Sequence, residues 1–100
     1  MIRHIVSWNF KESLTDSEKV ENGKKMKGEL EALKEVISEV SSIKVFTDSL
    51  ATSDREITLD SLFESEEALA AYQIHPAHVK VGKWLGTIVE NRLCIDFEEK

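Results

Sequence analysis

The sequence predicts an α+β fold in which helices cover one face of an antiparallel sheet, and three observations support it. The chain has 100 residues, the size of one domain, so residues 1–100 are expected to form a single unit. Segments of two-residue period and of helical period follow one another in the order βαββαβ. Glycine and proline are scarce, which leaves no flexible linker. This order is typical of a ferredoxin-like sandwich.

The first strand is predicted over residues 2–10, "IRHIVSWNF", because apolar and polar side chains alternate there. One face, which we expect to pack against the helices, carries Ile2, His4, Val6, Trp8 and Phe10. The other face has Ile5 as its one apolar member.

The first helix is expected to begin after Thr15, where Glu18 completes a capping box. Apolar residues then follow helical spacing and predict one buried stripe, formed by Val20, Met26, Leu30, Leu33 and Ile37. Gly23 lies on this stripe, although glycine costs about 1 kcal/mol in a helix interior. It either marks a close approach to another element or is a tolerated weak point.

Two more strands are predicted over residues 41–49 and 55–64, separated by the loop "LATSD". A final strand, "NRLCIDFEE", carries three apolar residues in alternation, and the sequence leaves open which face of the sheet they occupy: Leu93, Ile95 and Phe97. If they lie on the face away from the helices, another chain has to cover that face.

The second helical region is expected to consist of two pieces. Ser65 is a suitable N-cap for "EEALAAY". Pro76 disfavours the helical conformation at His75 and favours the first turn of a new helix, so the break is expected at His75. The second piece has its own buried stripe, formed by Val81, Trp84, Leu85 and Ile88.

Composition and charge exclude several classes of protein. The formal net charge is −6 and the basic residues are scattered among acids, which argues against binding to nucleic acid or to an anionic membrane surface. The first residues, "MIRHIVSWNF", do not look like a signal peptide or a membrane span. Cys94 is the only cysteine, so no disulfide forms within the chain, and a cytoplasmic location is expected.

The segment "AYQIHPAHVKVGKWL" (71–85) holds the candidate site. His78 falls in the first turn of the predicted second piece, where the positive end of the helix dipole favours a neutral imidazole that accepts a proton. A bend at His75 is expected to bring the Tyr72 hydroxyl towards the His78 ring. His4 approaches the two side chains from the first strand. Structural roles remain open for three of these residues: a cap for His75, a core histidine bonded to a backbone carbonyl for His4, and a core position for Tyr72.

We expect no metal and no cofactor. Histidines three residues apart can share a ligand, but the proline break between His75 and His78 spoils the helical geometry, and no carboxylate stands at an obvious ligand spacing. Cys94 is interpreted as inert packing, because no helix N-terminus lies near it to lower its pKa.

Three segments, "MIRHIVSWNFK", "FESEEALAAYQIHPAH" and "RLCIDFEE", resemble the stress-responsive A/B-barrel (Dabb) family over essentially the whole chain. The resemblance implies a ferredoxin-like subunit that forms a homodimer by packing sheet on sheet into a dimeric α/β-barrel with the helices outside. One branch, the olivetolic acid cyclase-type polyketide cyclases, closes a linear tetraketide thioester without a cofactor.

In that branch the positions matching His78 and Tyr72 are the acid/base pair. The positions matching His4, Val6, Trp8 and Leu59 line or adjoin the pocket between sheet and helices. Two further polar pocket residues of that branch correspond here to Ile57 and about Met26, so the polar surroundings that serve the cyclase are reduced.

Three functions are weighed. The first is a dimer that binds a small apolar or aromatic molecule. The second is a cofactor-independent lyase, cyclase or isomerase in which His78 removes a proton α to a carbonyl and Tyr72 donates to the enolate oxygen. The third is a structural dimer whose interior Trp8 and Met26 fill. Binding, or an unassigned stress-type function, ranks first and the enzyme second. The ligand contacts expected besides His78 and Tyr72 are His4, Val6, Trp8, Met26, Leu59, His75 and Trp84.

Overall fold

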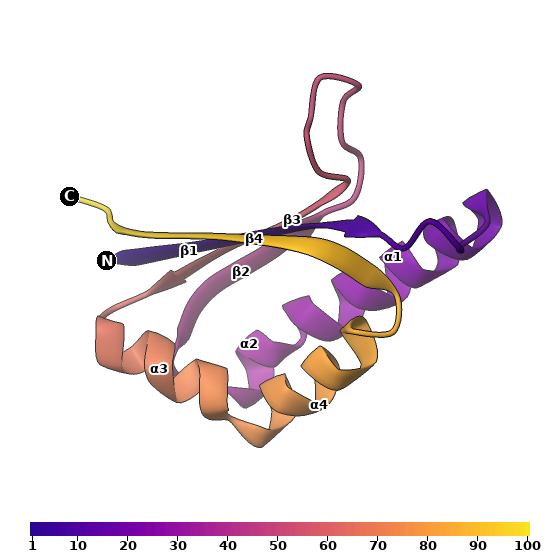
Figure 1. Ribbon diagram of the computed structural model, residues 1–100. Coiled ribbons are helices and arrows are strands. Elements are labelled where there is room, and N and C mark those ends of the chain that lie inside the picture. Colours follow the sequence, from indigo (N-terminus) through magenta and orange to yellow (C-terminus); the bar gives the residue numbers. More distant parts are fainter.

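The computed structural model describes residues 1–100 and has the ferredoxin-like architecture that the sequence predicts. The elements in chain order are β1 (Ile2–Phe10), α1 (Asp16–Glu31), α2 (Leu33–Val36), β2 (Val40–Phe46), β3 (Ile57–Phe63), α3 (Glu66–Ile74), α4 (Pro76–Leu85) and β4 (Val89–Glu98). The four strands form one antiparallel sheet in the order β2-β3-β1-β4. All helices lie on one face of this sheet (Figure 1).

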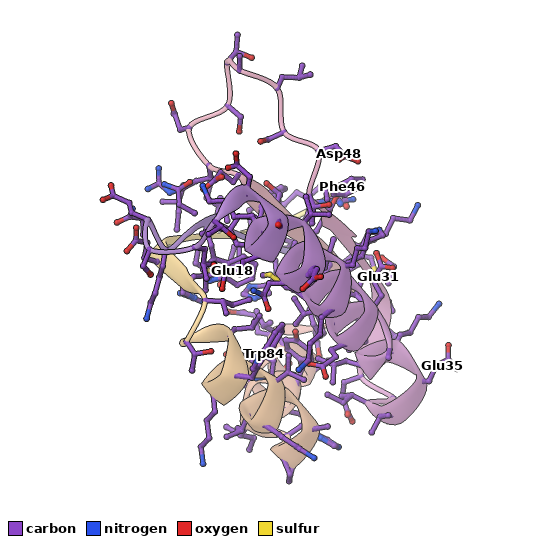
Figure 2. All side chains as sticks on the ribbon, turned by 90° about the vertical axis from the view of Figure 1, so that its right-hand side faces the viewer. Glu18, Glu31, Glu35, Phe46, Asp48 and Trp84 are labelled. Atoms are coloured by element: carbon purple, nitrogen blue, oxygen red, sulfur yellow. The ribbon has the colours of Figure 1, made fainter.

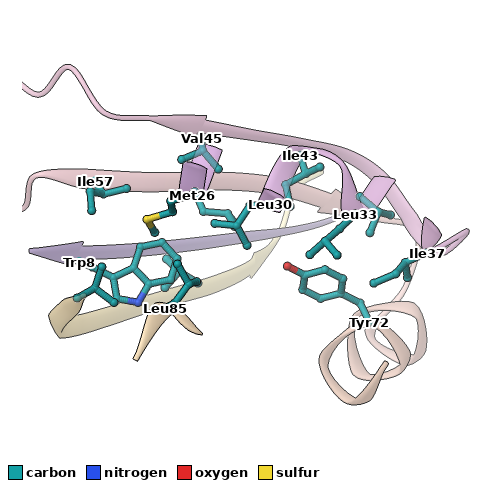
Figure 3. Packing of buried hydrophobic residues seen from close by; sticks show 14 of the residues in the cluster. Trp8, Met26, Leu30, Leu33, Ile37, Ile43, Val45, Ile57, Tyr72 and Leu85 are labelled. Carbon is teal, nitrogen blue, oxygen red and sulfur yellow. The ribbon is translucent and has the colours of Figure 1, made fainter. Parts of the chain in front are cut away.

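The core lies between the sheet and the helices, on the face of β1 that the sequence assigns to it. Alternate residues of β1 from His4 to Phe10 are buried, and β3 presents its own alternate residues beside them. The β1–β3 register pairs Val6 with Leu59 and Trp8 with Ile57, so these side chains form one continuous apolar layer. Met26 and Leu30 from α1 close over this layer (Figure 3).

The first helix begins after Thr15 as predicted. It ends at Glu31, before the last two residues of the predicted stripe, and the short helix α2 follows it. The Thr15 side chain accepts from the Glu18 backbone N–H, and the Glu18 carboxylate accepts from the Thr15 N–H, which completes the capping box. The expectation that Val20 is buried is wrong, because its side chain is 58% exposed. Val20 lies in the first turns of α1, where the helix extends beyond the end of the sheet (Figure 1).

Gly23 marks a close approach between α1 and the sheet. A Cβ atom at this position would lie 3.4 Å from Cζ of Phe10 and 3.6 Å from Cγ2 of Thr47. The absence of a side chain therefore lets the helix backbone lie directly on the ends of β1 and β2. This resolves the alternative that the sequence leaves open at Gly23.

A bulge in β4 sets the direction of its side chains. Ser7 pairs with Leu93 and Asn9 pairs with Glu90, so two residues, Asn91 and Arg92, lie opposite the single residue between Ser7 and Asn9. Asn91 adopts a φ of 55°, a left-handed conformation that asparagine tolerates better than most residues. The extra residue reverses the alternation of side chains along the strand.

Beyond the bulge, Cys94 lies opposite Val6 and Asp96 lies opposite His4, both on the face that the helices cover. The three apolar residues whose facing was open lie on the other face and are 44–50% exposed: Leu93, Ile95 and Phe97.

The connection between β2 and β3 is longer than predicted, because β2 ends at Phe46 and β3 begins at Ile57. This loop projects from the side of the sheet opposite the helices (Figure 1). No helix of the protein has the length and apolar character needed to cross a membrane.

Candidate functional site

A cavity of about 330 Å³ lies between the sheet and helices α3 and α4. Its volume falls within the range of small-molecule sites. The strands of the sheet line one side of the cavity, and the helices line the other side. The lining residues are His4, Val6, Trp8, Leu30, Leu59, Tyr72, Gln73, His78, Gly82, Leu85, Gly86, Val89, Glu90, Asn91 and Arg92.

The break between α3 and α4 brings Tyr72 and His78 together. His75 separates the helices with an extended backbone (φ −62°, ψ 134°), because Pro76 excludes the helical conformation there. Tyr72 in the last turn of α3 and His78 in the first turn of α4 then face each other, with ring centroids 4.4 Å apart. The sequence predicted both the break and this approach.

The tautomer of His78 follows from its hydrogen bond. Its Nδ1 lies 3.0 Å from the backbone oxygen of Gln73, which only accepts, so Nδ1 carries the proton and donates. In the neutral ring, Nε2 is then an acceptor. Burial lowers the pKa of His78, and this outweighs the opposing effect of the bond to Gln73. The direction agrees with the sequence-based expectation, but the leading cause is burial rather than the helix dipole.

Tyr72 is suited to donate a proton or a hydrogen bond. The side chain is 1% exposed, and burial raises its pKa to about 12, so the hydroxyl keeps its proton at neutral pH. The residue lines the cavity. Figure 3 shows the side chain reaching from α3 towards the interior of the core.

His4 is held from two sides. Its Nδ1 is hydrogen-bonded to Oδ1 of Asp96, and its backbone oxygen accepts from the Ser61 hydroxyl at 2.8 Å. The ring is 3% exposed and stands edge-on to Tyr72, with centroids 6.4 Å apart. The partner of the His4 ring is thus the Asp96 carboxylate and not a backbone carbonyl, the partner that a core histidine was expected to have.

The remaining predicted ligand contacts divide into two groups. Val6, Trp8 and Leu59 line the cavity together with His4, Tyr72 and His78. Met26, Trp84 and His75 do not line it, and each has another place in the fold.

Met26 is fully buried within the core. Trp84 lies on the side of α4 that faces α1, with Nζ of Lys25 4.4 Å from its ring centroid (Figure 2). His75 caps α4, its Nδ1 accepting from the backbone N–H of Ala77 at 3.0 Å.

The cavity also contains polar groups that were not predicted from the sequence, and Arg92 is the clearest of them. Arg3 is paired with Asp60 and Glu99, whereas Arg92 has no carboxylate within ion-pair distance. Its positive charge contributes to the lowered pKa of His78. The β4 bulge is what turns Arg92 towards the cavity, and no local sequence signal marks that bulge.

The opposite face of the sheet is a second surface of interest. It carries exposed apolar side chains from both edge strands, namely Phe46 on β2 and Leu93, Ile95 and Phe97 on β4. Ile5 on β1 pairs with Ile95 on β4. Polar groups of the central strands, namely the Arg3–Asp60 ion pair and the Ser7–Thr58 hydrogen bond, lie between Phe46 and the β4 residues. The row of exposed apolar residues on β4 is typical of a protein–protein interface.

Comparison with known proteins identifies relatives of the whole chain. The sequence model of the Stress Responsive A/B Barrel Domain family matches residues 2–99. No functionally curated protein matches the chain.

Several solved structures match closely. A dimeric protein of unknown function with a ferredoxin-like fold from Bacteroides fragilis is 31% identical, with a TM-score of 0.90 over 98% of this chain and 95% of its own. A Dabb family protein from Mesorhizobium loti is 22% identical, with a TM-score of 0.76 over 99% and 96% of the two chains. A hydroxynitrile lyase from Passiflora edulis is 18% identical, with a TM-score of 0.74 over 96% and 90%.

Proposed function

This chain belongs to the stress responsive A/B barrel domain family, and on that premise we propose that it is a homodimer whose subunits each bind a small, largely apolar or aromatic molecule between sheet and helices. The cavity carries this proposal. The polar groups of His4, Tyr72 and His78 converge there from different elements beside apolar side chains such as Val6, Trp8 and Leu59. The net charge of −6 supports a small molecule rather than a nucleic acid as the ligand.

The homodimer is supported by the exposed apolar face and by the relative at 31% identity, which is described as dimeric. A second copy of the same face would cover Ile95 and its neighbours on both subunits at once, because twofold interfaces use the same patch twice. The helices and the cavity then lie outside the sheet-on-sheet contact. A cytoplasmic location is part of the proposal, supported by the single cysteine.

Binding is tested with acetophenone as the probe, because it combines an aromatic ring with one carbonyl group. The two tryptophans provide an internal control in a nitrogen–proton NMR spectrum: Trp8 lines the cavity, and Trp84 lies outside it. We expect saturable shifts of the Trp8 indole signal and a much smaller response from Trp84. Equal shifts of both signals, or none at Trp8 up to the solubility limit of the probe, would contradict a binding cavity.

A cofactor-independent enzyme is the second candidate, because the geometry supplies both partners for enolisation. The free Nε2 of His78 removes a proton from the carbon α to a carbonyl, and the Tyr72 hydroxyl donates to the oxygen on which negative charge develops. Return of a proton to the opposite face of that carbon, or to a different carbon of the enolate, completes an isomerisation. Attack of the carbanion on a second carbonyl completes an aldol closure.

The enzyme proposal has a test that does not require the natural substrate. In deuterated water, an active pair accelerates exchange of the acetophenone methyl protons, which proton NMR follows directly. His78→Asn and Tyr72→Phe are expected to abolish the acceleration. His75→Asn is the matched control, because asparagine preserves the helix cap and His75 lies outside the cavity. Exchange at the uncatalysed rate in the natural chain, or an equal loss of the acceleration in His75→Asn, would contradict the enzyme proposal. Binding would then be the only function that remains.

A further inference from the structure

We propose that His4, Cys94 and Asp96 form a binding site for a divalent transition-metal ion of the zinc type. The three ligand atoms are an imidazole nitrogen, a thiol sulfur and a carboxylate oxygen, and they all lie within 4.8 Å of one another. The site stands beside the cavity, shares only His4 with it, and does not depend on the function proposed above.

The sheet itself brings the three residues together. In the β1–β4 register, Asp96 lies directly opposite His4, and Cys94 precedes Asp96 by two residues, so all three side chains project from the same face. The ligands are thus fixed by hydrogen-bonded strands rather than by flexible loops. Preorganisation of this kind favours binding, because little conformational entropy remains to be lost.

The distances suit tetrahedral coordination. Sγ of Cys94 lies 3.7 Å from Nδ1 of His4 and 3.5 Å from Oδ1 of Asp96. Bonds of about 2.3 Å to sulfur and about 2.0–2.2 Å to nitrogen and oxygen place such ligand atoms about 3.6 Å apart around a tetrahedral ion. His4 and Asp96 are closer, because a hydrogen bond joins them. The ion takes the place of that proton, and the Asp96 side chain, which is 41% exposed, has room to move aside.

The donor set and the charges select the class of ion. Thiolate, imidazole and carboxylate together are typical of zinc sites, whereas magnesium and calcium prefer oxygen ligands alone. One thiolate and one carboxylate balance the double positive charge of the ion. Arg92 is the one unfavourable charge near Cys94, and its exposed side chain is free to turn into solvent. Three protein ligands leave a fourth position for water or a ligand.

The ion reaches the site from the surface. Asp96 borders a hollow that also contacts Leu69 and Gln73, and Cys94 is half-buried. His4 is the deepest ligand and the best shielded from water.

The experiment uses Co²⁺ as a spectroscopic substitute and Zn²⁺ for affinity, on the full chain in a phosphine reductant that keeps Cys94 reduced. We expect one Co²⁺ per chain, with a thiolate-to-cobalt absorption band in the near ultraviolet that an equimolar amount of Zn²⁺ displaces. Cys94→Ser is expected to remove the band, and Asp96→Asn to weaken binding of Zn²⁺ at least about tenfold. Asp48→Asn is the matched control, because Asp48 is exposed near the end of β2, and it is expected to bind as the natural chain does.

Some results would overturn the proposal. One is the absence of a thiolate-to-cobalt band at millimolar Co²⁺. The others are an unchanged Zn²⁺ affinity in Cys94→Ser, or an equal loss of Zn²⁺ affinity in Asp96→Asn and Asp48→Asn. His78→Asn separates this site from one built on His75 and His78, because it is expected to retain the band. Loss of the band in folded His78→Asn, verified by circular dichroism, also counts against the proposed ligands.

Discussion

The rings of Tyr72 and His78 lie 4.4 Å apart although they belong to different helices. The contact depends on the single extended residue between α3 and α4, which Pro76 imposes. A continuous helix would place these side chains on different faces, because six residues correspond to more than one and a half turns. The break therefore creates the polar end of the cavity.

The first prediction concerns pH. Burial lowers the pKa of His78, so the folded protein binds this proton less readily than the unfolded chain does. The contribution of His78 to the free energy of unfolding is therefore fully present above its unfolded pKa of about 6.5 and is lost as the pH falls below it. We expect His78→Asn to flatten the pH dependence of the urea midpoint in this range. A carbon–proton NMR titration that gives His78 a pKa at or above its usual value would contradict the prediction.

The second prediction concerns assembly. Ile95→Glu places a charge in the middle of the exposed apolar row on β4, where a twofold contact meets it twice. We expect the dimer dissociation constant, measured by light scattering over a dilution series, to rise by about 30-fold or more. Val20→Glu is the control, because Val20 is at least as exposed as Ile95 but lies on α1, away from that face. A dimer that survives Ile95→Glu unchanged would place the interface elsewhere.

The third prediction uses two glycines with open space around them. A Cβ atom at Gly28 or at Gly82 meets nothing within 4 Å, so replacement by alanine is expected to raise the free energy of unfolding by about 0.5–1 kcal/mol at each position. Gly82 lines the cavity and Gly28 does not. Gly82→Leu is therefore expected to weaken acetophenone binding, while Gly28→Leu leaves it unchanged. Equal binding by the two leucine variants would show that the probe binds outside the cavity.

The fourth prediction concerns the bulge in β4. Asn91 has a φ of 55°, which a β-branched residue adopts only under strain. We expect Asn91→Val to lower the free energy of unfolding by about 1–2 kcal/mol in denaturant titrations, and Asn91→Gly to preserve it. If both variants are as stable as the natural chain, the left-handed conformation at this position is not required.

Local signals account for the parts of the fold that the sequence predicts correctly. Thr15, Ser65 and Pro76 determine where helices begin through interactions with their immediate neighbours, so a short window of sequence contains the necessary information. The same holds for the break at His75. Val20 was assigned wrongly because helical spacing does not indicate how far a helix extends beyond the sheet that it covers.

The parts that the sequence did not reveal depend on pairing between distant strands. The pair formed by His4 and Asp96 arises from the register of β1 with β4, and residues that far apart in the chain show no recognisable spacing. A bulge at Asn91 then decides which alternate residues of β4 face the helices. For that reason the sequence suggested His75 and His78 as the pair to consider for a metal, and gave no indication of Cys94 beside Asp96.

Adjacent residues of strand β4 contribute side chains to opposite faces of the sheet. Ile95 belongs to the exposed apolar face, while its neighbours Cys94 and Asp96 point under the helices towards His4. In the homodimer proposed above, a shift of this backbone at the subunit contact would also move the side chains of Cys94 and Asp96. By thermodynamic linkage, any change that pairing makes in the affinity for the proposed ion is matched by the same factor in the pairing constant.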